Sequence, residues 1–299
     1  MNIAELHVRD YKNLQNYLGI GVGIISIGDE ACVYHIPLGD EALKIGRNII
    51  KKGYRFKLIT PKLSDKHLQE FVLTLRLLHN NSIDYILVVN DLGLLYEAHK
   101  NNILPKEVFL GRGITRSLED TPWIEEYIED EKYPEDVLAN TLADEFKIEH
   151  YSKYGVTGIE TSLHINSFRG FKKITDRGWK ISCHIGNYVV AFSRKCAYAI
   201  YDKLQLGECS QACKNKIEIT MAQTTSDIEY QPCINKNNRD FTNLFLLGNV
   251  LYKKSEIPLC DILKNNVDIY SYVINDYDFT VSEIEELISK LQERESRVS

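Results

Sequence analysis

Residues 84–113, "DYILVVNDLGLLYEAHKNNILPKEVFLGRG", alternate between two kinds of hydrophobic pattern. The stretch opens and closes with short apolar runs, 84–90 and 107–113, and the segment between them carries apolar residues at helical spacing before it ends in Asn. A strand, a helix and a second strand in this order are typical of a βαβ unit on a parallel sheet. This stretch therefore predicts an α/β fold.

The same alternation continues along most of the chain. We expect strands at eight short runs, which are residues 3–8, 23–28, 55–60, 84–90, 107–113, 155–162, 179–185 and 268–274. Helical spacing fills segments between them, such as 40–53. Eight strands of this kind predict an irregular TIM-like (β/α) barrel.

We expect a single domain over residues 1–299, interrupted by two segments that a plain barrel does not need. The first, near 119–136, is an insertion rich in acidic and aromatic residues, which is either a solvated helix or a lid or docking surface. The second, near 194–240, is a long polar loop segment that bears cysteines. Loops of this length usually have a function or a ligand that organises them.

Composition limits the classes of protein to consider. A chain of 299 residues buries enough core to fold without covalent staples, and it has seven cysteines, an odd number. No secretory signal is visible, so we expect a reducing, cytoplasmic location in which clustered thiols bind metal. The net charge of −6 disfavours nucleic acid as a partner, and no apolar run reaches the length of a membrane span.

Three cysteines gather in the second segment. Cys196, Cys209 and Cys213 follow the spacing C-x(12)-C-x(3)-C, which suits either a zinc ion or a 4Fe-4S cluster. The fourth ligand is then Cys32, which follows a predicted strand, or Cys233 in the long loop. Cys183 and Cys260 are flanked by apolar residues and are expected in the core.

Several local motifs resemble one known family. They are "ISIGDEACVYH" (25–35), "VVNDLGLL" (88–95), "GNYVVAFSRKCAYA" (186–199), "LGECSQACKNK" (206–216) and "FLLGN" (245–249). In these motifs the chain resembles the collagenase-like U-32 peptidase family, and within it the UbiV-like branch of oxygen-independent ubiquinone-hydroxylation proteins. The resemblance implies a 4Fe-4S cluster held by four cysteines, which are Cys32, Cys196, Cys209 and Cys213.

The resemblance also implies a role in an anaerobic hydroxylation system. It points to a small-molecule substrate similar to a ubiquinone precursor, with prephenate as the oxygen donor, and to a heterodimer with a paralogous U-32-family subunit. Polar residues predicted at strand ends are the candidates for substrate or proton-transfer groups: Glu30, Asn90, Asp91, Arg112, Glu160 and His184. Each of them has the alternative role of a local hydrogen-bonding or helix-capping residue.

Two other functions stay open from the sequence. The chain is alternatively a non-catalytic electron relay or scaffold subunit, since a cluster with four thiolate ligands offers no obvious vacant iron. Peptidase activity is the other, but the sequence has no Gly-x-Ser-x-Gly elbow, no papain-like cysteine context and no His-Glu-x-x-His motif.

Overall fold

The structure is a computed structural model, and it describes residues 3–115, 139–163, 168–193, 196, 198–199, 209, 213, 216–219, 244–255 and 268–298. The predicted acidic insertion near 119–136 lies outside the described residues, as does most of the predicted loop near 194–240. The expectation of one domain over 1–299 stays a prediction.

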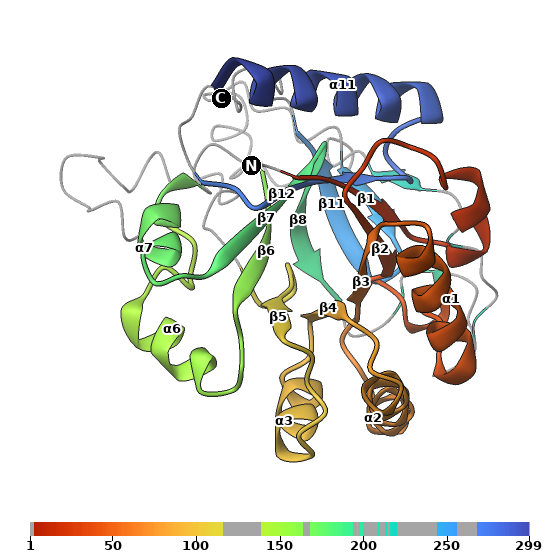
Figure 1. Ribbon diagram of the computed structural model, residues 1–299, viewed down its shortest axis with the longest axis vertical. Coiled ribbons are helices and arrows are strands. Elements are labelled where there is room, and N and C mark those ends of the chain that lie inside the picture. The colour runs from red at the N-terminus through yellow and green to blue at the C-terminus, as the bar shows by residue number, and fades with distance from the viewer. Residues whose placement is uncertain are drawn as a thin grey trace, which may run out of the picture.

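Eight parallel strands close into a barrel in the order β1, β12, β7, β6, β5, β4, β3, β2 (Figure 1). Their bounds are β1 (Ile3–Val8), β2 (Ile24–Gly28), β3 (Arg55–Ile59), β4 (Tyr85–Val89), β5 (Glu107–Leu110), β6 (Gly158–Ser162), β7 (Lys180–Ile185) and β12 (Ser271–Asn275). The predicted TIM-like barrel is therefore confirmed, with each of the eight predicted runs supplying one strand. Strand β5 ends before the run does, because residues 111–113 form a turn.

Helices follow the strands and cover the outside of the barrel (Figure 1). The α-helices are α1 (Gly39–Lys51), α2 (Asp65–Asn80), α3 (Leu92–Lys100), α6 (Glu145–Ser152), α7 (Phe171–Thr175) and α11 (Val281–Val298), and two 3-10 helices are η1 (Tyr11–Asn16) and η2 (Val33–His35). Helix α1 shows how close the packing is, since a Cβ at Gly46 would lie 2.9 Å from the Phe56 ring of β3. None of the described helices has the length and apolar character needed to cross a membrane.

A second, antiparallel sheet packs against loops at one end of the barrel. It has the order β8 (Asn187–Phe192), β11 (Val250–Lys254), β10 (Leu244–Leu247) and β9 (Ile217–Ile219). Its apolar side packs with Ala31, which follows β2, and Tyr277, which follows β12. This sheet therefore covers the carboxyl end of the strands, where TIM barrels carry their functional sites.

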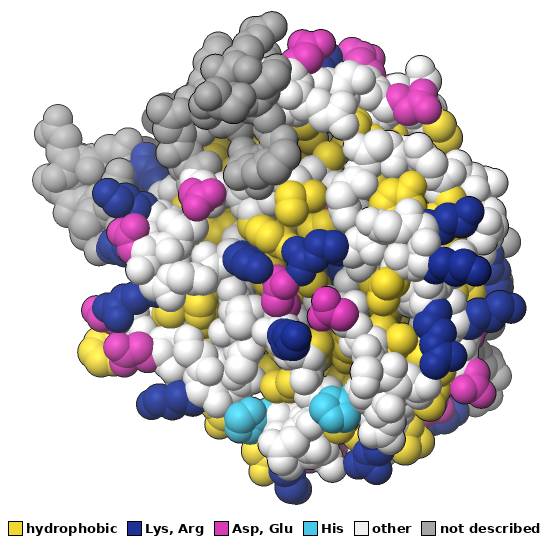
Figure 2. Space-filling model, viewed as in Figure 1, with side chains coloured by type: hydrophobic (Ala, Val, Ile, Leu, Met, Phe, Trp, Pro, Cys, Tyr) yellow, Lys and Arg dark blue, Asp and Glu magenta, His cyan; other side chains and the backbone are white. Residues whose placement is uncertain are grey.

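The barrel interior holds an apolar cluster and a separate group of charged side chains. Side chains of Ile24, Ile59, Ile86, Val88 and Phe109 form one buried apolar cluster. Glu5, Lys57 and Glu160 are also fully buried, and they come from three different barrel strands. On the outer face shown in Figure 2, basic and acidic side chains are interspersed, with hydrophobic side chains between them.

Candidate metal centre

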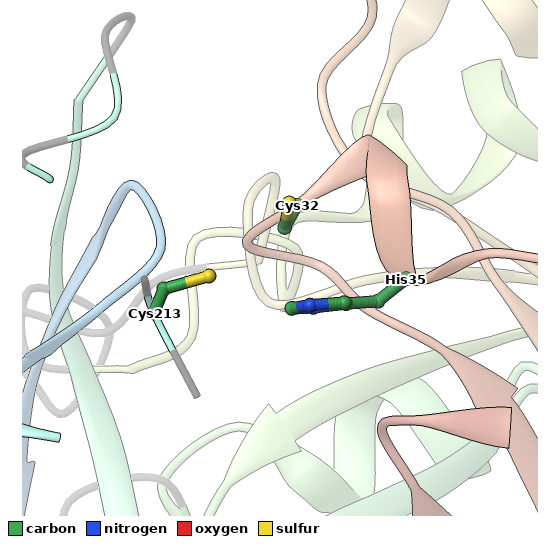
Figure 3. A group of neighbouring side chains, drawn as sticks. All are labelled: Cys32, His35 and Cys213. Atoms are coloured by element: carbon green, nitrogen blue, oxygen red, sulfur yellow. The ribbon is translucent and has the colours of Figure 1, made fainter. Parts of the chain in front are cut away.

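Three side chains of ligand type converge at the covered end of the barrel (Figure 3). Cys32, His35 and Cys213 each offer one ligand atom, and these three atoms lie within 4.8 Å of one another. Cys32 and His35 belong to the loop after β2, in which Cys32 is the N-cap of η2 and His35 its last residue. Cys213 comes from the far segment of the chain, so the group forms only in the folded protein.

Asp29 organises the loop after β2. The preceding residue, Gly28, has a φ of +118°, and a Cβ there would lie 2.1 Å from the carbonyl oxygen of Ile59, so only glycine fits. The Asp29 carboxylate then accepts hydrogen bonds from Ala31 N at 2.7 Å, from Arg9 Nε at 2.6 Å and from His35 Nδ1 at 2.8 Å. Burial acts to raise the pKa of Asp29, but Arg9 and His35 outweigh it and hold the pKa below its ordinary value.

The surroundings of Cys213 favour its thiolate, which is the form that binds metal. Hydrogen bonding from Cys32 is the largest cause that lowers the pKa of Cys213 to about 4, with burial opposing it and with His35 and Arg9 assisting. Arg9 donates from Nη1 to the Cys213 carbonyl oxygen at 3.1 Å and from Nη2 to Sγ at 3.7 Å. The same hydrogen bond to Cys213, together with burial, raises the pKa of Cys32.

His35 is held between Asp29 and Cys213. Burial acts to lower the pKa of His35, but hydrogen bonds with Asp29 and Cys213 raise it to about 9. These shifts favour a thiolate at Cys213 beside a protonated imidazole at His35. A metal ion that bound both residues would have to displace the proton of the imidazole.

The other two predicted ligands lie next to this group but outside its 4.8 Å limit. Cys196 Sγ contacts the carbonyl oxygen of Gly248 at 3.6 Å, and the turn at Gly248 packs on Ala31, where a Cβ would lie 2.8 Å from the Ala31 carbonyl oxygen. Cys209 is exposed. Burial raises the pKa of Tyr34, and the charges of Cys209 and Cys32 raise it further.

The remaining cysteines divide into two cases. Cys183 is fully buried in the main hydrophobic core, as the sequence predicts. Cys233, the competitor for the fourth ligand position, lies outside the described residues, and so does Cys260.

Two of the candidate polar residues form a buried ion pair between the loops after β2 and β5. Both oxygens of Glu30 accept hydrogen bonds from Arg112, of which the Nε bond measures 3.1 Å. Arg112 also donates to Asn187 Oδ1 at 3.2 Å and to Tyr277 OH at 3.3 Å, while Tyr252 OH donates to Glu30 at 2.8 Å. Each nitrogen of this buried guanidinium has a partner, so Arg112 joins the two sheets.

Glu160 and His184 belong to the charged interior of the barrel. Glu160 contacts His184 Nε2 at 3.2 Å and accepts a hydrogen bond from Lys57 Nζ at 2.9 Å, and Lys57 also donates to Glu5 at 2.7 Å and to Ser182 at 3.2 Å. Burial acts to raise the pKa of Glu160, but Lys57 and His184 lower it. Burial acts to lower the pKa of Lys57, but Glu5 and Glu160 outweigh it and hold the pKa above its ordinary value.

Two histidines continue this network towards the thiol site. His184 Nδ1 and His7 Nδ1 each lie 3.0 Å from Asn275 Oδ1, and His7 Nε2 lies 2.8 Å from the carbonyl oxygen of Gly28. Burial lowers the pKa of His184, and Arg112 adds to that effect. The hydrogen-bonded network inside the barrel therefore reaches Gly28, the residue that precedes Asp29.

Asn90 and Asp91 have local structural roles. Asp91 is the N-cap of α3, where it accepts a hydrogen bond from Leu94 N at 3.2 Å, and it also accepts one from Leu63 N at 3.1 Å. Asn90 donates to the carbonyl oxygen of Thr60 at 2.7 Å and accepts from Gly113 N at 2.7 Å. These bonds fix the loops after β3, β4 and β5.

Sequence reasoning missed several residues of the site. Arg9, Asp29 and His35 surround the thiols, yet only His35 carried a signal, because it follows Cys32 at the x(2) spacing of many metal-binding pairs. Lys57 carried no signal in the sequence, because a lysine inside a short apolar run normally marks a solvent-facing position.

A cavity of about 200 Å3 lies between β9, β10 and the loop after β12. Lys216, three residues after Cys213, lines it together with Asp278, Phe245 and Phe279. Lys216 Nζ lies 2.5 Å from Asp278 Oδ1 and 4.4 Å from the centre of the Phe245 ring. The cavity thus offers charged groups and aromatic surface to a small molecule.

Comparisons with known proteins leave the function to be argued from these residues. No protein-family model matches the chain, and no curated protein matches it. The chain is similar to the solved structure of the U32 peptidase Mk0906, with 12% sequence identity, a TM-score of 0.44 and an alignment that covers 92% of each chain.

Proposed function

We propose that this chain binds a 4Fe-4S cluster and serves as a subunit of an oxygen-independent hydroxylation system of the U-32 peptidase type. The observation that supports it most is the convergence of Cys32 and Cys213 with His35 beside a fixed cation, Arg9. Two soft thiol ligands in an environment that favours thiolate suit iron-sulfur clusters and zinc.

The number of thiols in this part of the chain favours a cluster over a single ion. Thiolates on one zinc ion, with bonds of about 2.3 Å, lie roughly 3.8 Å apart, whereas a cubane cluster needs a wider shell. Cys196 stands beyond the inner group, next to the Gly248 turn, and Cys209 is exposed. The proposed ligands are therefore Cys32, Cys196, Cys209 and Cys213, as the sequence resemblance implies.

A bound cluster would supply one-electron transfer at the covered end of the barrel. The protein's own groups prepare that position. Arg9 donates to Cys213 Sγ, Asp29 holds Arg9 and His35 in place, and the second sheet covers the loop that carries Cys32. The cavity lined by Lys216 and Phe279 is the proposed site for the small molecule, with a prephenate-type oxygen donor and a paralogous partner subunit as the sequence resemblance implies.

Anaerobic purification of the full chain tests the metal assignment. Iron, acid-labile sulfide and zinc are quantified for the native chain, for Cys213→Ala and for Cys183→Ala, a control at a buried cysteine of the core. We expect about four irons and four sulfides per chain, as a 4Fe-4S cluster requires, with visible absorption that dithionite bleaches. Cys213→Ala should lose the iron, the sulfide and the visible absorption, and Cys183→Ala should keep all three. Zinc without sulfide, or no metal at all, contradicts the proposal.

One observation favours a second candidate function. Cys213, His35 and Asp29 stand in the order of a cysteine-peptidase triad, in which an acid orients the imidazole beside a thiolate. Cys213 is only 2% exposed, which leaves little room for a peptide at its sulfur. A metal-free preparation that cleaves peptides and loses this activity in both Cys213→Ala and His35→Ala would favour the peptidase, whereas an inactive one keeps the cluster as the working assignment.

A further inference from the structure

Arg9 is a fixed positive charge directed at the thiol site. It is 5% exposed, and its Nε donates to Asp29 at 2.6 Å while Nη1 donates to the Cys213 carbonyl oxygen at 3.1 Å. Its backbone N donates to Asp276 at 3.1 Å, so both the chain and the guanidinium are anchored. The remaining nitrogen, Nη2, is thereby aimed at Cys213 Sγ, 3.7 Å away.

An arginine in this position cannot lose its charge, since its guanidinium stays protonated in proteins. Hydrogen bonds to cluster sulfurs and nearby net charge are among the factors that set the reduction potential of iron-sulfur centres. Reduction adds a negative charge to the centre. A buried cation that donates to a ligand sulfur stabilises the reduced state more than the oxidised state, and so raises the potential.

We propose that Arg9 sets the reduction potential of the metal centre through its contact with Cys213, and that Asp29 limits this effect as the buried anion paired with Arg9. The proposal rests on the proposed cluster and adds residues that determine how readily that cluster accepts an electron. Arg9 and Asp29 act here as positioning residues, because neither binds the metal.

The two residues make predictions of opposite sign. Removing the cation in Arg9→Met should lower the midpoint potential, and Arg9→Lys should lower it less, because lysine keeps the charge but not the forked geometry. Removing the anion in Asp29→Asn should raise the potential. Asparagine can still accept the hydrogen bond from Ala31 N, so this variant tests charge while preserving much of the loop.

The experiment is a redox titration of the anaerobically purified full chain, followed by visible absorption and by EPR of the reduced state. Arg47→Met is the matched control, because it removes an exposed arginine of α1 that donates a hydrogen bond to Asn81 and takes no part in the thiol site. Iron and sulfide content are measured on each variant, so that a shifted potential is read only from loaded protein. If Arg9→Met does not bind the cluster, the midpoint potentials of Asp29→Asn and Arg9→Lys are compared with that of the native chain instead.

We expect a lower potential for Arg9→Met, a higher one for Asp29→Asn, and an unchanged one for Arg47→Met. Equal potentials for the native chain and a loaded Arg9→Met overturn the proposal, as does a shift of the same sign in the Arg9→Met and Asp29→Asn variants. A native chain without iron and sulfide refutes the cluster itself, and this result is distinguishable because it appears before any titration.

Discussion

Lys57 balances two buried carboxylates inside the barrel, and its removal gives a prediction whose size and pH dependence follow from the structure. Lys57 Nζ lies 2.7 Å from Glu5 and 2.9 Å from Glu160, and all three side chains are at most 1% exposed. In Lys57→Met the two carboxylates lose their counter-charge. Removing one partner of a buried ion pair costs about 3–5 kcal/mol, because the remaining charge stays buried without compensation.

The expected loss in melting temperature follows from chain length. For 299 residues the entropy of unfolding is about 0.6 kcal/mol/K, so this cost corresponds to a drop of about 5–8 °C at neutral pH. Lys66→Met, at an exposed position in the first turn of α2, is the matched control and should leave the melting temperature nearly unchanged. Adding Glu160→Gln to Lys57→Met restores the original net charge of the network and should recover much of the loss.

The pH dependence should change sign. In the native chain the pKa of Glu160 is lowered, so this group stabilises the fold above its ordinary pKa, about 4.3, and the contribution is lost as pH falls towards the lower value. Without Lys57, burial should raise the pKa of Glu160 above its ordinary value of about 4.3. The variant then loses stability as pH rises from about 4.3 to this raised pKa. As pH falls through that window, the difference in unfolding free energy between the native chain and Lys57→Met should shrink by about 1.4 kcal/mol per pH unit.

Thermal unfolding at pH 7.5 and pH 5.0 measures both effects. We expect Lys57→Met to fall furthest below the native chain at pH 7.5 and to approach it at pH 5.0. A deficit that is the same at both pH values, or that grows on acidification, would show that the ion pairs described above for Lys57 are wrong. A melting temperature equal to that of Lys66→Met would refute the cost assigned to the uncompensated carboxylates.

Two further substitutions separate structural residues from those of the site. Gly248→Ala places a Cβ 2.8 Å from the Ala31 carbonyl oxygen at a φ of +63°, so it should reduce the iron of the proposed cluster. Gly53→Ala, with a φ of +90° and open space around the Cβ, imposes the backbone strain alone and should keep the iron. Asp91→Ala removes the N-cap of α3 and should cost about 1 kcal/mol in thermal unfolding without changing the visible spectrum; a lost spectrum would give Asp91 a role at the site.

Much of the barrel could be predicted from sequence because both faces of a parallel strand are usually buried. Runs such as 84–90 are apolar between a polar first and a polar last residue, and the helical segments between runs have clear apolar spacing, so strand and helix types could be told apart. The second sheet was missed because β8 and β11 pair antiparallel and are separated by the long loop segment. Nothing local in β8 or β11 indicates that the two strands pair.

The candidate site was predictable only for residues with unusual chemistry. Cys32 and Cys213 stood out as thiols, and the structure brings them together. Arg9 and Asp29 did not, because their importance depends on β1 and β2 being neighbours. Glu5 and Lys57 were hidden for a related reason: alternation along a strand shows that two faces differ, but not that the polar face points into a closed barrel.

The register of β1 connects the barrel interior to the thiol site. Glu5, His7 and Arg9 stand at alternate positions of this segment, so they share one face, and they contact Lys57, the Gly28 carbonyl oxygen and Cys213 respectively. Parallel pairing with β2 and with β12 on its two sides fixes that register. A slip by one residue would turn all three polar side chains towards the helices and bring Leu6 and Val8 inside.

It follows that the charges inside the barrel and the geometry around Cys213 depend on the same strand. His7 bonds to Gly28, which directly precedes Asp29, so the interior network supports the loop that orients Arg9 and His35. A disturbance at Lys57 should therefore reach the thiol site through β1, whereas a disturbance at Gly53, beyond the end of α1, has no such path. Reduced iron content in Lys57→Met beside full content in Gly53→Ala would establish this connection.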